Sequence, residues 1–301
     1  MKYAYLGPQG TFTEAAVLQV AAPDDVLMPL ASVDAALEAV RAGAADRAVV
    51  PIENSVEGGV PQTLDSLGSG APLMVVREML VQVTFVLAAR AGTRLVDVRG
   101  VASHPHGWAQ CRGWVGAHLP LATYVPALST AAAAQGLTAQ APYDAALCSP
   151  LAAERAGLEV LASDVGDNSA AVTRFVLVSR PQQVGRPSGA DKTSVVVFQN
   201  DDHPGGLLEL LEQFATRGIN LTRIESRPTG DALGRYCFSI DCEGHVGEAR
   251  VAEALMGLHR TCSQVRFLGS YPRADGVAAV VGPTTSDDTF ARARAWLDTF
   301  R

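Results

Sequence analysis

The sequence lacks the signatures of several large protein classes. It has only five cysteines among 301 residues, widely spread and without CxxC or zinc-site spacing, so we expect reduced thiols rather than a disulfide or zinc framework. No apolar run is long enough to span a bilayer. A strand is expected from Lys2 onward, which argues against a signal peptide. Together these absences predict a cytoplasmic protein without membrane contact.

Motifs for bound phosphates and for a hydrolytic serine are missing too. There is no GxGxxG, no P-loop and no GxSxG. The net charge is −7 and the basic residues are scattered, which leaves no footprint for nucleic acid. His104 and His106 are two residues apart with no carboxylate or cysteine partner near them in the sequence, so we expect no metal site.

What the sequence does contain is a globular composition in several parts. Hydrophobic residues make up 48% of the chain and charged residues 18%, and the length suffices for two or three domains. A stretch rich in Pro, Gly and polar residues at 181–190 predicts a linker.

Before this linker, strand-like and helix-like segments alternate. We expect strands at 2–6, 46–50, 81–89, 98–102, 124–126, 144–149 and 175–178, and helices at 13–18, 32–42, 61–67, 129–140 and 150–156, with another beginning at Pro105. We expect the last strand to return from the second half to the first. This order predicts an α/β fold of two lobes around a cleft, like that of periplasmic binding proteins.

Polar segments follow three of these strands, where open α/β sheets hold their ligands, and a fourth polar pair precedes the last strand. The glycine turn at 7–11 leads into a helix capped by Thr11 or Thr13, a general arrangement for binding anions. Residues 51–60 and 103–111 are similarly placed. Thr173 and Arg174 stand where the returning strand begins and offer a hydroxyl and a planar guanidinium to a carboxylate. Helix caps, polar turns and a solvated arginine would explain the same residues without any ligand.

After the linker the pattern is βαββαβ, which predicts a ferredoxin-like module. Its strands are expected at 193–199, 219–227, 235–241 and 264–271, and its helices at 207–217 and 247–259. Modules of this shape often pair edge to edge, so we expect a dimer. A last helix is expected at 287–300, and the sequence gives no function for it.

The polar segments resemble the successive motifs of the prephenate dehydratase family. These motifs are Gly-Pro-x-Gly-Thr-Phe-Thr at 7–13, Pro-Ile-Glu-Asn-Ser at 51–55, Ser-His-Pro at 103–105 with Gln-Cys at 110–111, and Thr-Arg-Phe at 173–175. The ferredoxin-like module resembles an ACT domain, because 220–228 matches the family's phenylalanine-binding motif and 268–272 its usual close. The motifs occur in the family's order over about 1–272. Two positions depart: His106 replaces a usual Gln, and 205–208 has Gly where Ala is common.

The resemblance implies a carbon–oxygen lyase that converts prephenate to phenylpyruvate, CO2 and water without a cofactor. The expected catalytic residues are Thr173, Asn54, Ser103 and Gln110, and the expected substrate-binding residues are Thr11, Glu53, Ser55, Arg174 and Phe175. Among them we assign to Thr173 the hydrogen-bond donor beside the departing hydroxyl. No metal is expected.

The resemblance also implies feedback control within L-phenylalanine biosynthesis. Phenylalanine would bind between two ACT modules of a homodimer or tetramer and favour one of two arrangements. The expected effector contacts are Gly205, Gly206, Leu207, Leu208, Asn220, Leu221, Glu225, Ser226, Arg227 and Pro228. A purely structural dimerisation module is the alternative reading of this part.

The expected domains are a catalytic domain at 1–181, an ACT regulatory domain at 191–272 and a tail at 273–301. Within the catalytic domain, lobe 1 covers about 1–78 and 170–181, and lobe 2 about 79–169. No fused chorismate mutase domain is expected ahead of the first strand. Two other functions stay open: an arogenate dehydratase, whose substrate carries an amine on its side chain, and a non-catalytic amino-acid-sensing binding protein.

Overall fold

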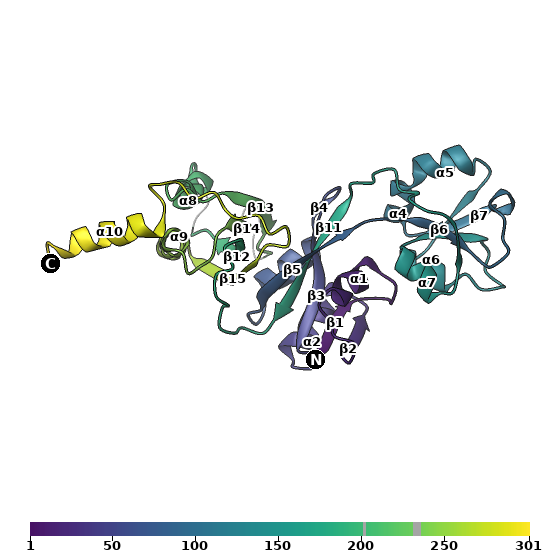
Figure 1. The fold of residues 1–301 in the computed structure, drawn as a ribbon, viewed down its shortest axis with the longest axis horizontal. Helices are drawn as coiled ribbons and strands as arrows, with labels where there is room; N and C mark the ends of the chain where they lie inside the picture. The colour runs from purple at the N-terminus through teal and green to yellow at the C-terminus, as the bar shows by residue number, and fades with distance from the viewer. Residues whose placement is uncertain (201–202, 231–235) are drawn as a thin grey trace. The chain divides into compact units, whose positions relative to one another are not determined.

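Three β-sheets organise the chain in the computed structural model, which describes residues 1–200, 203–230 and 236–301 (Figure 1). The chain divides into two compact units. The first comprises Met1–Val60 and Met79–Phe175, and the second Pro61–Glu78 and Val176–Arg301. No helix in the described ranges is long and apolar enough to cross a membrane.

The first sheet has the strand order β2-β1-β3-β11-β5, with β4 paired to β3. Its strands are β1 (Lys2–Leu6), β2 (Val26–Leu30), β3 (Arg47–Asn54), β4 (Gly58–Gly59), β5 (Met74–Gln82) and β11 (Val172–Ser179). Strand β1 runs parallel to both β2 and β3. The helices α1 (Phe12–Leu18) and α2 (Val33–Arg41) pack against these strands through apolar faces that include Val17, Leu37 and Val40. Helix α3 is Pro61–Gly68.

The second sheet has the order β10-β6-β9-β7-β8. Its strands are β6 (Val86–Ala89), β7 (Gly100–Ser103), β8 (Thr123–Pro126), β9 (Ala145–Cys148) and β10 (Glu159–Ala162); its helical segments are η1 (Leu95–Asp97), α4 (Pro105–Gln110), α5 (Arg112–His118), α6 (Thr130–Gln135) and α7 (Pro150–Arg155). Successive residues of β6 point to opposite faces, yet both Leu87 and Ala88 are fully buried. Helices therefore cover both faces, as the separate core clusters around these two residues confirm.

Two chain crossings join these sheets within the first unit. One is the short link 83–85 between β5 and β6, and the other is 163–171 between β10 and β11. They are hydrogen-bonded to each other, because the Val83 N–H donates to the Ala171 carbonyl at 2.8 Å. The predicted return of the last strand to the first sheet is thus confirmed.

Several expected elements were wrong in extent. The predicted single strand 81–89 is two strands, β5 and β6, which belong to different sheets because 83–85 crosses between them. The predicted helix 129–140 ends at Gln135, where Gly136 forms the C-cap and Leu137 turns into the core. Strand β3, expected to end at residue 50, continues to Asn54 and so includes the first part of the polar segment 51–60. Strands β2 and β10 and helix α5 were not anticipated.

The third sheet confirms the predicted βαββαβ module and has the order β13-β14-β12-β15. Its elements are β12 (Asp191–Phe198), α8 (Gly206–Ala215), β13 (Leu221–Pro228), β14 (Tyr236–Glu243), α9 (Ala249–Thr261) and β15 (Gln264–Pro272), followed by α10 (Asp287–Asp298). Residue 235, the predicted start of the third strand, lies outside the described residues. Both α8 and α9 pack on one face of this sheet around Val195, Phe214 and Leu258.

The opposite face of the third sheet carries a buried polar network. The Arg223 guanidinium donates to both oxygens of Asp241, at 2.9 and 3.0 Å, and to the Ser239 hydroxyl at 2.9 Å. Asp241 also accepts from the Ser194 hydroxyl at 2.6 Å. Buried charges need such partners, so this network links the edge strand β13 to β14 and β12.

All five cysteines are unpaired thiols. Burial raises the pKa of Cys111, Cys148 and Cys242 to about 12. A thiol with such a pKa is almost wholly protonated near neutral pH and is a poor nucleophile. These three cysteines therefore serve as core residues.

Gly10, in the turn before α1, is held where a side chain does not fit. Its φ is +85°, and an added Cβ would lie 2.8 Å from the Ala152 Cα in α7. We predict that Gly10→Ala lowers the free energy of unfolding by about 1–3 kcal/mol. Gly116→Ala is the control, because this helical position has open space around its Cβ; it should be neutral or stabilising by up to about 1 kcal/mol. Equal effects of the two variants in denaturant titrations would contradict this account.

Candidate active site

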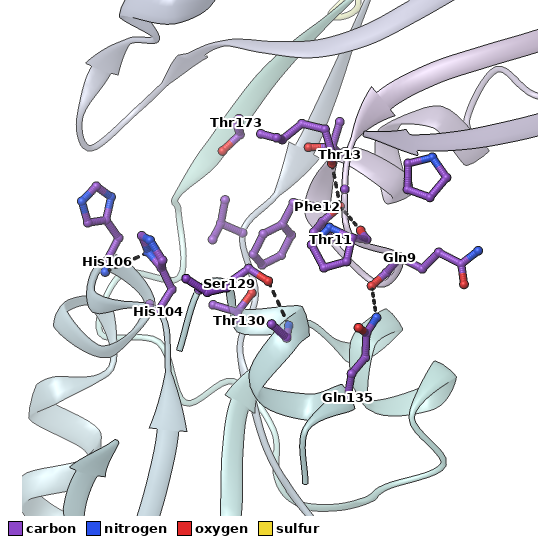
Figure 2. Close-up of a pocket in the computed structure, with 18 of the residues that line it drawn as sticks. Gln9, Thr11, Phe12, Thr13, His104, His106, Ser129, Thr130, Gln135 and Thr173 are labelled. Carbon is purple, nitrogen blue, oxygen red and sulfur yellow. Dashed lines mark hydrogen bonds between the residues drawn. The ribbon is translucent and has the colours of Figure 1, made fainter. Parts of the chain in front are cut away.

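A cavity of about 1010 Å³ lies between the two lobes of the first unit. Its walls come from the β1–α1 turn, the segment after β3, the 83–85 crossing, the N-terminal part of α4, the β8–α6 loop and β11 (Figure 2). The volume suits a small organic ligand. The polar lining residues include Gln9, Thr11, Thr13, Asn54, Gln110, Ser129, Thr130, Gln135 and Thr173.

Thr173 and Asn54 meet in this cavity from two neighbouring strands. The Asn54 Nδ2 donates to the Thr173 Oγ1 at 2.8 Å, and both side chains line the wall. Because the threonine oxygen accepts this bond, its own proton is directed elsewhere and can be donated to a ligand. Thr173 is only 8% exposed, so a ligand that reaches it must leave most of its water behind.

The same asparagine shapes the segment that follows β3. Its Oδ1 accepts the backbone N–H of Val56 at 2.8 Å and of Glu57 at 3.3 Å. Ser55 is fixed to β11, since it donates its N–H to the Val172 carbonyl at 2.9 Å and accepts the Val172 N–H on its hydroxyl at 3.0 Å. Ser55 therefore holds the wall in place rather than lining the cavity.

Arg174 and Phe175 do not line the cavity. Side chains alternate along a strand, so Arg174 points away from the face that carries Thr173. It is buried and lies 3.4 Å from the Glu53 carboxylate. Phe175 is on the same face as Thr173 but is 2% exposed within the core.

Ser103 is likewise not brought to the cavity surface. It is fully buried, and its hydroxyl donates to the Leu147 carbonyl at 2.9 Å. It packs beneath Gly107, where an added Cβ would lie 2.8 Å from the Ser103 Oγ and 2.7 Å from the Thr130 Cγ2. Gln110, the last residue of α4, does line the cavity.

Thr11 lines the cavity and caps α1, as expected, by accepting the Glu14 N–H. The neighbouring Gly10 N–H donates to the Glu14 carboxylate, which is 1% exposed and ion-paired with Arg155 at 2.6 Å. A carboxylate of the protein thus occupies the glycine turn, whose arrangement is also typical of anion sites.

Three contacts hold the two lobes together at the base of the cavity. The Gln135 Nε2 donates to the Gln9 carbonyl at 2.8 Å (Figure 2). The buried Ser149 hydroxyl donates to the Gly10 carbonyl at 2.7 Å, and the Glu14–Arg155 pair adds the third contact. These contacts tie α6 and α7 of the second lobe to the β1–α1 turn and α1 of the first lobe.

The sequence did not identify several lining residues. Ser129 and Thr130 begin α6 directly after β8, and a polar pair in that position could have been included by the rule used for the other strand ends. Phe12 and Phe85, with ring centroids 5.6 Å apart, form an apolar wall. Their pairing could not be anticipated, because it joins two lobes.

His104 and His106 also line the cavity and lie side by side (Figure 2). A carboxylate that is distant in the sequence approaches them, since Glu57 lies 2.9 Å from the His106 Nδ1. Burial, and then the neighbouring His106, lower the pKa of His104. No group of three or more possible metal ligands occurs in the described part of the chain.

The cavity thus combines apolar walls with neutral hydrogen-bonding groups. Aromatic and aliphatic side chains favour a ring, while hydroxyl and amide groups from separate segments can orient its polar substituents. This is the arrangement of a two-lobed α/β enzyme with a small-molecule cleft and an appended ferredoxin-like module.

Comparison with known proteins identifies the family of this chain. The family model described as prephenate dehydratase matches residues 3–183, and the ACT domain model matches 194–260. The chain therefore belongs to the prephenate dehydratase family, a family of lyases, and carries an ACT domain.

Individual relatives agree over nearly the whole chain. A prephenate dehydratase from Amycolatopsis methanolica is 49% identical over 297 residues, covering 98% of this chain and 96% of that protein. The solved structure of a prephenate dehydratase from Arthrobacter aurescens in complex with L-Phe is 58% identical, with a TM-score of 0.95 and coverage of 100% and 99%. A structure described as GqqA, a quorum quenching acylase, is 32% identical, with a TM-score of 0.81 and coverage of 90% and 98%.

Proposed function

We propose that the cavity binds prephenate and catalyses its decarboxylating dehydration to phenylpyruvate. The observation that carries this proposal is the Asn54–Thr173 hydrogen bond, which presents a hydroxyl donor inside a cleft with apolar walls. Membership of the family and the match over the whole chain give the reaction.

The reaction needs little from the protein beyond holding and polarising the substrate. As the bond between the ring and its carboxylate breaks, CO2 leaves and the electron pair completes the aromatic ring. The ring hydroxyl departs with a proton as water. The gain of aromaticity supplies the driving force, so a donor at the departing oxygen is the group most needed.

Thr173 is the donor that we assign to that oxygen. A threonine hydroxyl is too weak an acid to give up its proton outright, so it hydrogen-bonds the departing oxygen or passes on a proton received from elsewhere. Asn54 fixes its direction by donating to the threonine oxygen. Gln110 and Thr11 are placed to orient the rest of the substrate.

The other predicted substrate residues would act through position rather than contact. Ser55 fixes the strand end that carries Asn54, and Ser103 supports the close packing of α4 against α6. The Arg174–Glu53 pair supports β11 from the opposite face. We therefore propose positioning roles for Ser55, Ser103, Arg174, Glu53 and Phe175.

We propose that phenylalanine regulates the enzyme through the ACT module, as the resemblance implies. The predicted contact segments present apolar surface: Leu207, Leu208 and Ile224 are exposed on α8 and β13. Gly205, with φ +93°, begins α8 beside them. The relative from Arthrobacter aurescens is described in complex with L-Phe, which supports the same ligand here. The proposed effector contacts are Gly205, Gly206, Leu207, Leu208, Asn220, Leu221, Glu225, Ser226, Arg227 and Pro228.

A hydrogen-bonded link leads from the proposed effector segment to α3. Arg227 donates to both oxygens of Asp65, each at 2.8 Å. Arg266 on β15 donates to the carbonyls of Ser69 and Gly70, at 2.9 and 3.0 Å, just past the end of α3. In the chain, α3 directly follows the segment that begins at Asn54. An effector that moved Arg227 would therefore change its contact with α3, the helix that follows the Asn54 segment in the chain.

The remaining parts of the proposal are a homodimer or tetramer joined through ACT modules, and a cytoplasmic location. The edge strand β13 and the apolar residues exposed beside it support an association of modules. Arogenate, which carries an ammonium group in place of the keto oxygen, is the second substrate candidate for the same cleft.

We predict that removing the Thr173 hydroxyl impairs turnover far more than binding. Thr173→Val keeps the side-chain shape, and kcat should fall by about 100-fold or more while KM changes by less than about threefold, because the group acts in the transition state. Thr173→Ser should retain most activity. Thr138→Val, at an exposed site away from the cavity, is the control. Phenylpyruvate formation gives the rates, and a Thr173→Val enzyme with near wild-type kcat would rule out this role.

We predict that Asp65→Asn uncouples regulation from catalysis. The bidentate contact from Arg227 would be weakened, so about fivefold more phenylalanine should be needed for half inhibition, while kcat without effector should change by less than about twofold. Asp97→Asn is the matched control, because Asp97 forms a similar bidentate pair with Arg94 on η1. If the two variants respond alike to phenylalanine, the α3 link carries no signal.

A further inference from the structure

Charge is scarce among the described residues that line the cavity. None of them is lysine or arginine, and the side chains that can carry charge are Glu57, His104 and His106. Among the described lining residues, these three side chains are therefore the ones that can interact with a charged ligand through a charge of their own.

His104 is held as a neutral donor. Its Nδ1 accepts the His106 N–H at 3.3 Å and so caps α4, which requires an unprotonated Nδ1 and leaves the proton on Nε2. The lowered pKa of His104 agrees with this tautomer. The charge balance of the cavity thus depends on the other two groups.

Glu57 and His106 form a pair across the cavity. Glu57 belongs to the segment after β3 in the first lobe, while His106 stands on the first turn of α4 in the second lobe. The Glu57 carboxylate lies 2.9 Å from the His106 Nδ1, and both side chains are about half exposed. The imidazole therefore engages a carboxylate that would otherwise face a ligand without a partner.

An unpaired Glu57 would change which ligand the cavity favours. A lone carboxylate repels the two carboxylates of prephenate, but it attracts the ammonium group that distinguishes arogenate. When the Glu57 carboxylate is paired with His106, both its repulsion of prephenate and its attraction of arogenate are weakened. The pair is thus placed to discriminate between a keto acid and the corresponding amino acid.

We propose that the Glu57–His106 pair is a specificity determinant, in which His106 masks the Glu57 carboxylate and thereby favours the keto acid over the amino acid. This inference rests on the proposed prephenate dehydratase activity. It assigns no chemical step to either residue.

The test compares kcat/KM for prephenate and for arogenate in wild type, His106→Gln, Glu57→Gln and the double variant. Glutamine keeps the approximate size of each side chain without its charge. In His106→Gln the ratio of the two values should move toward arogenate by about fivefold, the upper end of what an exposed ion pair contributes. Glu57→Gln and the double variant should show a wild-type or more prephenate-selective ratio, because neither retains a bare carboxylate. His259→Gln, at an exposed site on α9, is the control for a histidine replaced elsewhere.

The outcomes separate this inference from the function on which it rests. A wild-type enzyme that turns over neither compound would overturn the proposed function. An active wild type whose selectivity is the same in His106→Gln would overturn the specificity role alone. A shift in His106→Gln that the double variant does not reverse would show that His106 acts without Glu57, and this too would overturn the proposal.

Discussion

The hydrogen bond from the Asn54 amide to the Thr173 hydroxyl is the constraint on which the cleft depends. It joins the ends of two strands that are far apart in the chain, and it uses both halves of the amide. The nitrogen directs Thr173, while the oxygen folds the following segment and so sets the position of Glu57. Because one side chain does both, the donor and the charged wall of the cavity are placed together.

The cavity also needs its two lobes to be held together, and the contacts at its base do this. Gly10 allows α7 to approach within contact distance, and its carbonyl then accepts the buried Ser149 hydroxyl. Glu14 takes the Gly10 N–H and pairs with Arg155. The glycine turn, whose arrangement is typical of anion sites, thus forms part of the contact between the two lobes. The Gly10 N–H already donates to the Glu14 carboxylate, so a ligand is left to the other groups that line the cavity.

Much of this could be predicted from the sequence, and the failures share a physical cause. Polar residues after the carboxyl ends of strands reach a common edge, which pointed to Thr11 and Asn54. The family resemblance added Gln110 and gave Thr173 its role, and all four residues line the cavity. Arg174 and Ser103 were misplaced because a one-residue step reverses the face of a strand and a hydroxyl can be turned into the core. The strand expected at 81–89 failed because apolar periodicity does not mark a crossing between sheets. The Glu57–His106 pair joins two lobes, and no local pattern records such a contact.

The scarcity of fixed cations in the cleft makes sense for a substrate that must lose a carboxylate. A guanidinium held against the ring carboxylate would stabilise the ground state more than the transition state, because the charge leaves that group as CO2 forms, and tighter binding of this kind slows the reaction. Arg174 is one residue from Thr173, but it faces the other way and lies against Glu53. Neutral donors can orient the same carboxylate without resisting its departure. None of the described residues that line this cleft is lysine or arginine, and the His106 ring lies against the Glu57 carboxylate. If prephenate binds here as proposed, the dianion is recognised mainly through polarity and shape, which leaves the electrons of the ring carboxylate available to the ring.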